Sequence, residues 1–142
     1  MFRLTFIFVS ILSTMPSSLA LSADVVKWED LELIRGKFYK KNTTVPYSGN
    51  VGGAQSGLIK DGRKTGEWTG YYENGSILWE GLYSEGVIKL WVEYHENGEV
   101  FAKGPYAGGK KNGEWRIFDN GGKLVAIEIF ENGKAVEVRV VK

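Results

Sequence analysis

The sequence predicts an all-β protein, built as a repeat array of antiparallel β-hairpins behind an N-terminal signal peptide. Three tryptophans recur at intervals of 23 and 24 residues, each followed by an aromatic residue at the third position and a glycine at the seventh. The positions are Trp68, Tyr71 and Gly75, then Trp91, Tyr94 and Gly98, and then Trp115, Phe118 and Gly122. Such fixed-period similarity is typical of arrays whose units bury their apolar faces by stacking on their neighbours.

Each unit is predicted to be a β-hairpin. Asn74-Gly75 lies between two runs of aromatic and β-branched residues, which is the strongest local signal for a two-residue type I′ turn. The resulting register places Tyr72 opposite Ile77, Tyr71 opposite Leu78, Gly70 opposite Trp79 and Trp68 opposite Gly81. Each tryptophan then lies opposite a glycine, so its indole can cover the bare backbone of the neighbouring strand.

Because side chains alternate along a strand, this register predicts two different faces. The aromatic face, which we define by Trp68, also carries Tyr72, Ile77, Trp79 and Tyr83, and the opposite face carries Tyr71, Leu78 and Leu82. The same reasoning at Asn97-Gly98 places Tyr94 opposite Phe101 on the opposite face, and Trp91, His95, Val100 and Tyr106 on the aromatic face.

The first 23 residues have the layout of a Sec signal peptide. Arg3 precedes an apolar run over residues 4–12, and small residues follow, with cleavage expected after Ala20 or a few residues later. A single membrane anchor is disfavoured because a spanning helix needs about 20 apolar residues. Without a cysteine near this junction, a bacterial lipoprotein is excluded. We therefore expect an exported chain, periplasmic or secreted, with residues 24–57 forming the N-terminal strands and a degenerate first repeat, and residues 58–142 forming the hairpin repeats.

The segment ahead of the repeats is expected to form strands. Residues 31–39 are interpreted as two strands with a turn at Gly36, and Pro46 as the end of pairing or an edge position. A short helix over residues 27–34 is the alternative, because its apolar residues share helical spacing. Residues 51–57, VGGAQSG, resemble a first hairpin that has lost its Asn-Gly turn.

The second and third repeats depart from the first. The second is one residue shorter and lacks the glycine before its tryptophan, so we expect a different connection there. In the third, Asn120-Gly121-Gly122 leaves the turn centre uncertain by one residue, and keeping the repeat register pairs Phe118 with Val125.

A last hairpin is predicted around Asn132-Gly133. Its register pairs Ile129 with Val136, Ile127 with Val138 and Val125 with Val140, all on the opposite face. The aromatic face there would carry Glu128, Glu137 and Arg139, so the array is expected to end in a more polar cap.

These residues carry a family resemblance. The unit Lys-x-Gly-x-Trp, followed by Tyr or Phe, Asn-Gly and Gly-x-Tyr, resembles the MORN-repeat variant over about residues 34–134. FYKKNTTVPYSGNV ahead of KDGRKTGEWTGYYENGSILWEGLY is similar to the YwqK-family antitoxins of toxin–antitoxin systems. The resemblance implies a meander of antiparallel hairpins that acts as a protein-binding or lipid-associated scaffold without chemistry of its own.

The residue types that catalysis needs are scarce. The chain has no Cys and one His, so neither a zinc site with the usual ligands nor a Cys-His nucleophile pair can be assembled. His95 is interpreted as the cross-strand partner of Val100. Glu67 and Glu114 occupy equivalent places in two repeats, which favours a structural role. The sequence therefore predicts no catalytic residue, no metal or cofactor site and no enzyme activity.

The net charge of the chain limits the kinds of partner that the sequence predicts. The net charge is +1, from 18 basic and 17 acidic residues, which disfavours a nucleic-acid partner. The short basic groups, such as Lys110-Lys111, are interpreted as solvated turns.

Six aromatic side chains form the candidate binding site. If all of them were exposed to solvent, their apolar area would be larger than the exposed apolar patches of typical monomers. The six residues are Trp68, Trp79, Tyr83, Trp91, Tyr106 and Trp115. Either the N-terminal segment covers this face, or the face docks a partner. The leading hypothesis is an exported scaffold that binds another protein at the cell envelope. An antitoxin-like or immunity-like neutraliser and a module that contacts phospholipid or the cell wall remain alternatives, and neither partner identity nor oligomeric state is fixed by the sequence.

Overall fold

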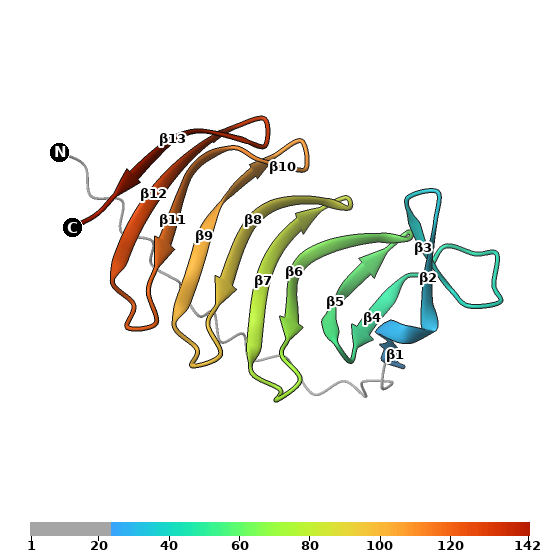
Figure 1. The fold of residues 1–142 in the computed structure, drawn as a ribbon. Helices are drawn as coiled ribbons and strands as arrows, with labels where there is room; N and C mark the ends of the chain where they lie inside the picture. Colours follow the sequence, from blue (N-terminus) through green and yellow to red (C-terminus); the bar gives the residue numbers. More distant parts are fainter. Residues whose placement is uncertain (1–23) are drawn as a thin grey trace, which may run out of the picture.

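The chain folds into one long antiparallel meander with a small separate hairpin. The computed structural model describes residues 24–142, so the predicted signal peptide lies outside the described residues. From β4 to β13 the strands follow one another in sequence order, with β10 pairing only β9 (Figure 1). They are β4 (Gly49–Gly52), β5 (Gln55–Lys60), β6 (Arg63–Tyr71), β7 (Ile77–Ser84), β8 (Val87–Tyr94), β9 (Val100–Ala107), β10 (Lys110–Lys111), β11 (Gly113–Phe118), β12 (Leu124–Glu131) and β13 (Lys134–Val140). The predicted all-β meander is confirmed.

The N-terminal segment forms strands as expected. β1 (Val26–Lys27) pairs parallel with β4, a 3₁₀ turn covers Trp28–Asp30, and β2 (Leu31–Ile34) pairs with β3 (Lys37–Lys40) around the predicted turn at Gly36. The alternative of a helix over residues 27–34 is wrong beyond that one turn. Pro46 makes an isolated bridge to Tyr39, and the degenerate first hairpin is confirmed as β4–β5.

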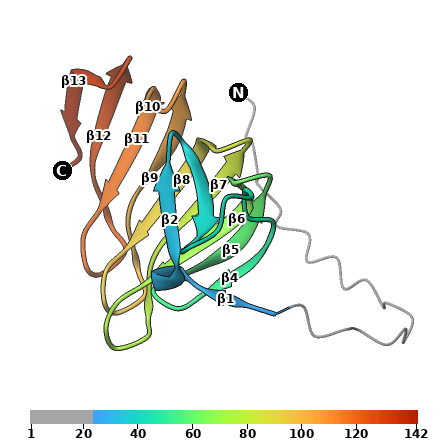
Figure 2. The same ribbon diagram turned by 90° about the vertical axis from the view of Figure 1, so that its right-hand side faces the viewer.

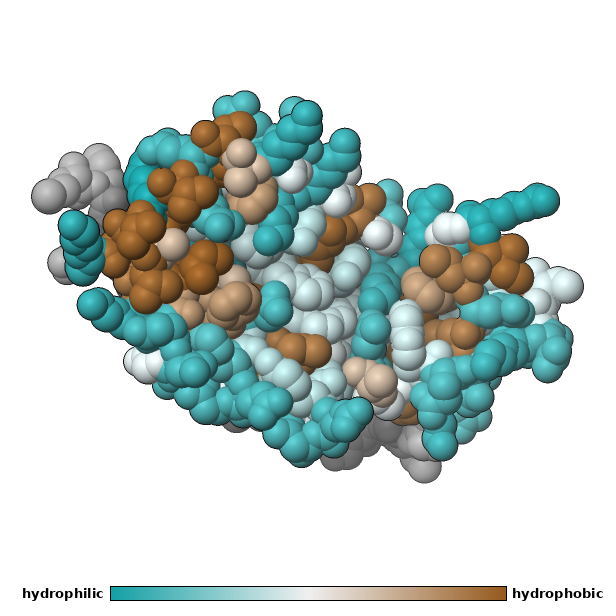
Figure 3. All heavy atoms as spheres, viewed as in Figure 1, coloured by the Kyte–Doolittle hydropathy of each residue, from teal (hydrophilic) through white to brown (hydrophobic). Residues whose placement is uncertain are grey.

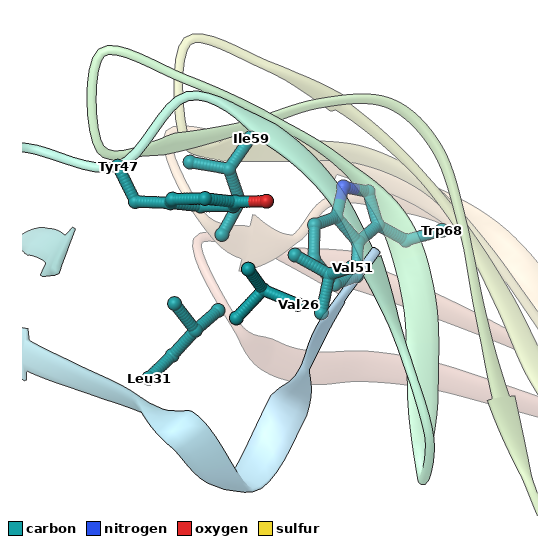
Figure 4. Packing of buried hydrophobic residues seen from close by; sticks show 6 residues of the cluster. All are labelled: Val26, Leu31, Tyr47, Val51, Ile59 and Trp68. Carbon is teal, nitrogen blue, oxygen red and sulfur yellow. The ribbon is translucent and has the colours of Figure 1, made fainter. Parts of the chain in front are cut away.

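This segment covers the start of the aromatic face. Figure 2 shows the β2–β3 hairpin standing beside the sheet near β4 to β6. Trp68 packs there with apolar side chains from β1, β2, β4, β5 and the loop before β4, which form the main core (Figure 4). The members are Val26, Leu31, Tyr47, Val51, Ile59 and Trp68. Of the two sequence-based alternatives, covering by the N-terminal segment therefore holds for the first part of the face.

Two kinds of turn connect the strands, one kind at each end of the strands. At one end the turns have two residues, both with positive φ, and the flanking residues pair, as in a type I′ hairpin. They are Asp61-Gly62, Glu85-Gly86, Gly108-Gly109 and Asn132-Gly133. At the other end of the strands the loops have three residues, and their last residues are the repeat glycines Gly75, Gly98 and Gly122.

The predicted type I′ turn at Asn74-Gly75 is wrong. The N–H of Gly75 donates to Tyr72 O at 2.9 Å, Gly75 has a φ of 84°, and Asn74 lies outside the positive-φ region. This is a three-residue loop, a type I turn followed by a left-handed glycine. The Asn74 side chain stabilises it by accepting a hydrogen bond from the Ser76 N–H at 2.9 Å.

The extra loop residue changes the register near each turn but not farther away. Trp68–Gly81 and Gly70–Trp79 pair as predicted. A β-bulge follows each loop, so the predicted pairings nearest the turns are wrong. In the first repeat, Tyr72 faces Ser76 instead of Ile77, and Tyr71 pairs with Ile77 instead of Leu78. In the other two repeats, Tyr94 pairs with Val100 instead of Phe101, His95 faces Glu99 instead of Val100, and Phe118 pairs with Leu124 instead of Val125. In the third repeat, the N–H of Gly122 donates to Asp119 O at 2.9 Å, which resolves the uncertain turn centre.

The connection before the second repeat differs in its strand and not in its turn. Glu85-Gly86 is a two-residue turn like its counterparts, contrary to the expectation of a different connection. The first and third repeats then bend at Gly66 and Gly113, with φ of 68° and 95°. The second repeat lacks this glycine and instead bulges between Ile88 and Leu90.

The last hairpin corrects the predicted cap. A bulge between β12 and β13 pairs Ile129 with Glu137, Ile127 with Arg139 and Glu128 with Val138, whereas the prediction paired Ile129 with Val136 and Ile127 with Val138. Val140 pairs with Ala126 instead of Val125. Because paired residues share a face, Val138 and Val140 lie on the aromatic face, and Glu137 and Arg139 lie on the opposite face. The outermost strand is therefore not the polar cap that was expected.

Candidate binding face

All six residues of the candidate site lie on the aromatic face. Trp68 and Trp91 both pair with Gly81, and Trp79 pairs with Gly70 one step along the same face. The rings of Tyr83 and Trp68 are 6.4 Å apart, and those of Tyr106 and Trp115 are 5.4 Å apart, both edge to face. The six side chains nevertheless differ in how much surface they offer.

Trp68 and Trp115 are buried ribs of the fold, with exposed fractions of 0% and 1%. Each indole lies flat on a glycine of the preceding strand, so that a Cβ at Gly57 or Gly104 would come within 2.4 or 2.5 Å of the ring. Their indole N–H groups donate to the next carbonyl, Leu58 O at 3.1 Å and Pro105 O at 3.0 Å. A partner therefore cannot reach these two side chains in the folded protein.

A lysine covers each buried tryptophan from above. The Nζ of Lys64 lies 4.1 Å from the Trp68 ring centre, and within 5.4 Å of the rings of Trp28, Tyr83 and Trp79. It also donates to Gln55 Oε1 at 2.7 Å, and burial lowers the pKa of Lys64 to about 8. In such a cation–π contact the ammonium group lies over the ring, and the aliphatic part of the lysine side chain covers apolar surface.

Lys111 repeats this arrangement in the third repeat. Its Nζ lies 3.9 Å from the Trp115 ring centre and 5.0 Å from that of Phe130. The interpretation of Lys110-Lys111 as a solvated turn is therefore wrong for Lys111. The sequence did contain a signal for both contacts, since Lys64 and Lys111 each stand four residues before a repeat tryptophan.

The middle repeat lacks this cover. Ile88 pairs with Tyr83 where Lys64 pairs with Ile59 and Lys111 with Tyr106, so an apolar side chain replaces the lysine. Trp91 then stacks on Trp79, with ring centres 4.5 Å apart and planes 16° apart. Both rings are half-buried, and no described residue accepts a hydrogen bond from either indole.

Two carboxylates on this face belong to neither ion pair of the described residues. Glu93 lies between Trp79 and Ala102 on the neighbouring strands, and Glu128 lies opposite Trp115. Burial and the Glu93 carboxylate raise the pKa of Tyr106. Since Lys64 and Lys111 are held over rings, the central part of the aromatic face presents stacked indoles beside a carboxylate.

The opposite face is a mixture of polar and apolar side chains. A hollow of about 350 Å³ crosses β6 to β8, where Leu82 and Leu90 lie beside Glu67 and Glu80. The Tyr94 hydroxyl donates to Glu80, and burial together with this contact raises the pKa of Tyr94. Glu114, the repeat equivalent of Glu67, forms an ion pair with Arg116 at 2.8 Å.

The single histidine of the chain makes structural contacts. His95 packs edge to face on Phe101 and its Nε2 lies 3.1 Å from Phe118 O, which makes it a link between two loops. Within residues 24–142 there is no group of three side chains that could hold a metal ion. Over the same residues no helix is long and apolar enough to cross a membrane.

Comparison with known proteins identifies the repeats. The family described as MORN repeat variant matches residues 64–85, 88–107 and 111–134. Each match begins near the start of β6, β8 or β11 and ends close to a two-residue turn, so the matched unit is the hairpin defined by the tryptophan period. No curated protein and no solved structure matches the chain significantly.

Proposed function

Because the chain is a MORN-repeat protein, we propose that it is a non-catalytic binding module that holds a protein partner on the central part of its aromatic face. MORN repeats are generally protein-binding or membrane-binding modules. The further choice of a protein partner rests on the composition of this one region of the face.

The observation that carries the proposal is the half-buried Trp79–Trp91 stack, in which no lysine lies over Trp91. In the repeats on either side, a lysine and neighbouring rings bury the tryptophan, whereas this pair is half-buried. Stacked indoles supply a large rigid contact area at a small cost in conformational entropy. Tryptophan is accordingly among the residues that dominate binding energy in protein interfaces.

The charge beside the stack indicates the chemistry of the partner. Glu93 adjoins Trp79, and Glu128 lies farther along the same face. A segment that combines a lysine or arginine with apolar side chains would satisfy both the carboxylate and the rings. An anionic lipid surface would instead be repelled by these carboxylates, which is why we favour a protein.

The test is capture of partners from the native cell envelope by the tagged chain. Trp91→Ala should reduce capture more than it lowers the melting temperature, because a half-buried ring contributes more to a partner than to the core. Tyr71→Ala, an exposed aromatic side chain on the opposite face, is the matched control and should leave capture unchanged.

A second pair of variants tests the charge. Glu93→Lys should abolish capture of a cationic partner, whereas Glu67→Lys on the opposite face should not. Equal loss of capture and of melting temperature in Trp91→Ala would make Trp91 a structural rib only, and the proposal would fail. Flotation of the wild-type chain with anionic vesicles would favour the lipid alternative instead.

We further propose that the protein works outside the cytoplasm, at the cell envelope, because of the signal-peptide pattern in residues 1–23. N-terminal sequencing of the chain recovered from the periplasm or medium should begin between about residues 21 and 24; a cytoplasmic chain that retains Met1 would contradict export. The antitoxin role implied by the sequence resemblance stays a prediction, which a toxin gene beside this one would support.

A further inference from the structure

We propose that β13 pairs, antiparallel and edge to edge, with β13 of a second copy of this chain, with Val138 opposite Val138 on the two-fold axis. The two meanders would then form one continuous sheet. The proposal rests on the backbone, the charges and the apolar side chains of residues 137–140.

The outer edge of β13 has free hydrogen-bonding groups. The N–H of Val141 donates to Val125 O at 2.9 Å, so the backbone polar groups of Val141, and of Arg139 two residues earlier, face β12. Because these groups alternate in antiparallel pairing, those of Val138 and Val140 face away from β12. No strand of residues 24–142 pairs with that edge, which makes it a template for strand addition.

The charges of β13 complement themselves in one register. With Val138 opposite Val138, Glu137 of each copy lies opposite Arg139 of the other. The two side chains already form an ion pair at 2.6 Å within the strand, so pairing would join two ion pairs into a network of four charges. Moving the centre by one residue places Glu137 opposite Glu137 or Arg139 opposite Arg139, and like charges directly opposite destabilise a sheet.

Apolar side chains on the aromatic face favour the same contact. Val138 and Val140 are 58% and 77% exposed. They extend the apolar surface that gathers over β11–β13 in Figure 3 to the edge of the sheet. Natural edges are usually protected by a bulge or a lysine. On β13 the bulge and Lys134 lie toward the turn, which leaves residues 137–140 open to pairing.

The experiment is sedimentation velocity of the purified chain over a wide concentration range. A reversible monomer–dimer equilibrium is expected, and a weak one, because such a short ladder buries less than the about 1,200 Å² of a standard interface. Val138→Pro removes an outward N–H without touching the ladder to β12, since proline is tolerated where its nitrogen faces solvent. It should raise the dimer dissociation constant about tenfold or more.

Charge reversal provides a test with an internal rescue. Glu137→Arg puts a cation opposite Arg139 and should weaken the dimer about tenfold or more, whereas Glu137→Arg combined with Arg139→Glu should restore it. Glu67→Arg is the matched control, because Glu67 is the repeat equivalent of Glu114 on the same face of the internal strand β6, far from β13, and the substitution should leave the dimer unchanged.

A unique thiol tests the register. The chain has no Cys, so Val138→Cys introduces a single one. In a hydrogen-bonded pair the two Cα atoms would lie about 5.5 Å apart, within disulfide range, and mild oxidation should link the copies. Lys134→Cys, which lies far from its symmetry mate in this register, should not. A wild-type chain that stays monomeric at all concentrations, a dimer that survives Val138→Pro, or open-ended oligomers would each overturn the proposal.

Discussion

Replacing Gly104 by alanine tests whether the tryptophan-on-glycine contact holds the third repeat together. A Cβ at Gly104 would lie 2.5 Å from the Trp115 indole, so the ring must leave its position. The backbone itself tolerates alanine, because Gly104 is not among the glycines with positive φ. The cost therefore comes from displacing one buried side chain.

The contacts of Trp115 set the size of the effect. Overpacking of this kind costs about 1–3 kcal/mol. Displacement also weakens the hydrogen bond to Pro105 O, worth about 1 kcal/mol, and the cation–π contact with Lys111, worth about 0.5–2 kcal/mol. Since these losses overlap, we expect Gly104→Ala to lower the free energy of unfolding by about 2–4 kcal/mol, measured by urea denaturation.

Gly81 supplies the matched control. It occupies the same row of the sheet, but the nearest atoms to its added Cβ are the Ile88 Cδ1 and a Tyr83 ring carbon at 3.0 Å, with Trp91 at 3.3 Å. The Ile88 side chain can change rotamer, so Gly81→Ala should cost about 1 kcal/mol or less. A loss for Gly81→Ala equal to or larger than that for Gly104→Ala would refute the idea that the flat indole contact is what stabilises the outer repeats.

Three further outcomes are expected. Between pH 8 and about 10.4, the stability of wild type relative to Lys64→Met should rise with pH. Burial lowers the pKa of Lys64 in the folded protein to about 8, so in this pH range the unfolded chain binds a proton that the folded protein has lost. A difference in melting temperature between the two proteins that does not change with pH would contradict this. Gly122→Ala, at a φ of 78°, should destabilise by about 1–2 kcal/mol in urea denaturation, whereas Gly121→Ala should cost much less because Gly121 lacks a positive φ. Tyr94→Phe leaves Glu80 without its hydroxyl donor and should cost about 1–2 kcal/mol in the same assay; no change would mean that water replaces the bond at no cost.

The candidate site could be predicted from the sequence as a set of residues but not as a surface. The tryptophan period and strand alternation put all six aromatic residues on one face, and the pairs Trp68–Gly81 and Gly70–Trp79 agree with that prediction. Which of them stay accessible depends on Lys64, Lys111 and Trp28, which reach the rings through space. The two lysines could have been found from their position four residues before a repeat tryptophan, whereas no local pattern in the sequence reports the contact of Trp28.

The length of the turns also could not be predicted from the sequence. An Asn-Gly pair is compatible with a two-residue turn and with the last two positions of a three-residue loop, because glycine supplies positive φ in both. The structure uses the longer loop at Asn74-Gly75 and the shorter turn at Asn132-Gly133. A single residue in the loop or in a bulge changes the pairing partner, which is why the pairings near every turn and those of Val138 and Val140 were wrong.

The sequence alone determined the all-β architecture, the hairpin unit and the chemical difference between the two faces, because these depend on periods of about 23 and of two residues that any local window displays. The tertiary structure decided which tryptophans are buried, how the loops close and what the outermost strand presents. Those properties depend on contacts through space, such as Lys64 over Trp68 and Trp79 on Trp91, and on bulges that offset one strand against its neighbour. The repeat period and the alternation of side chains along a strand specify neither of them.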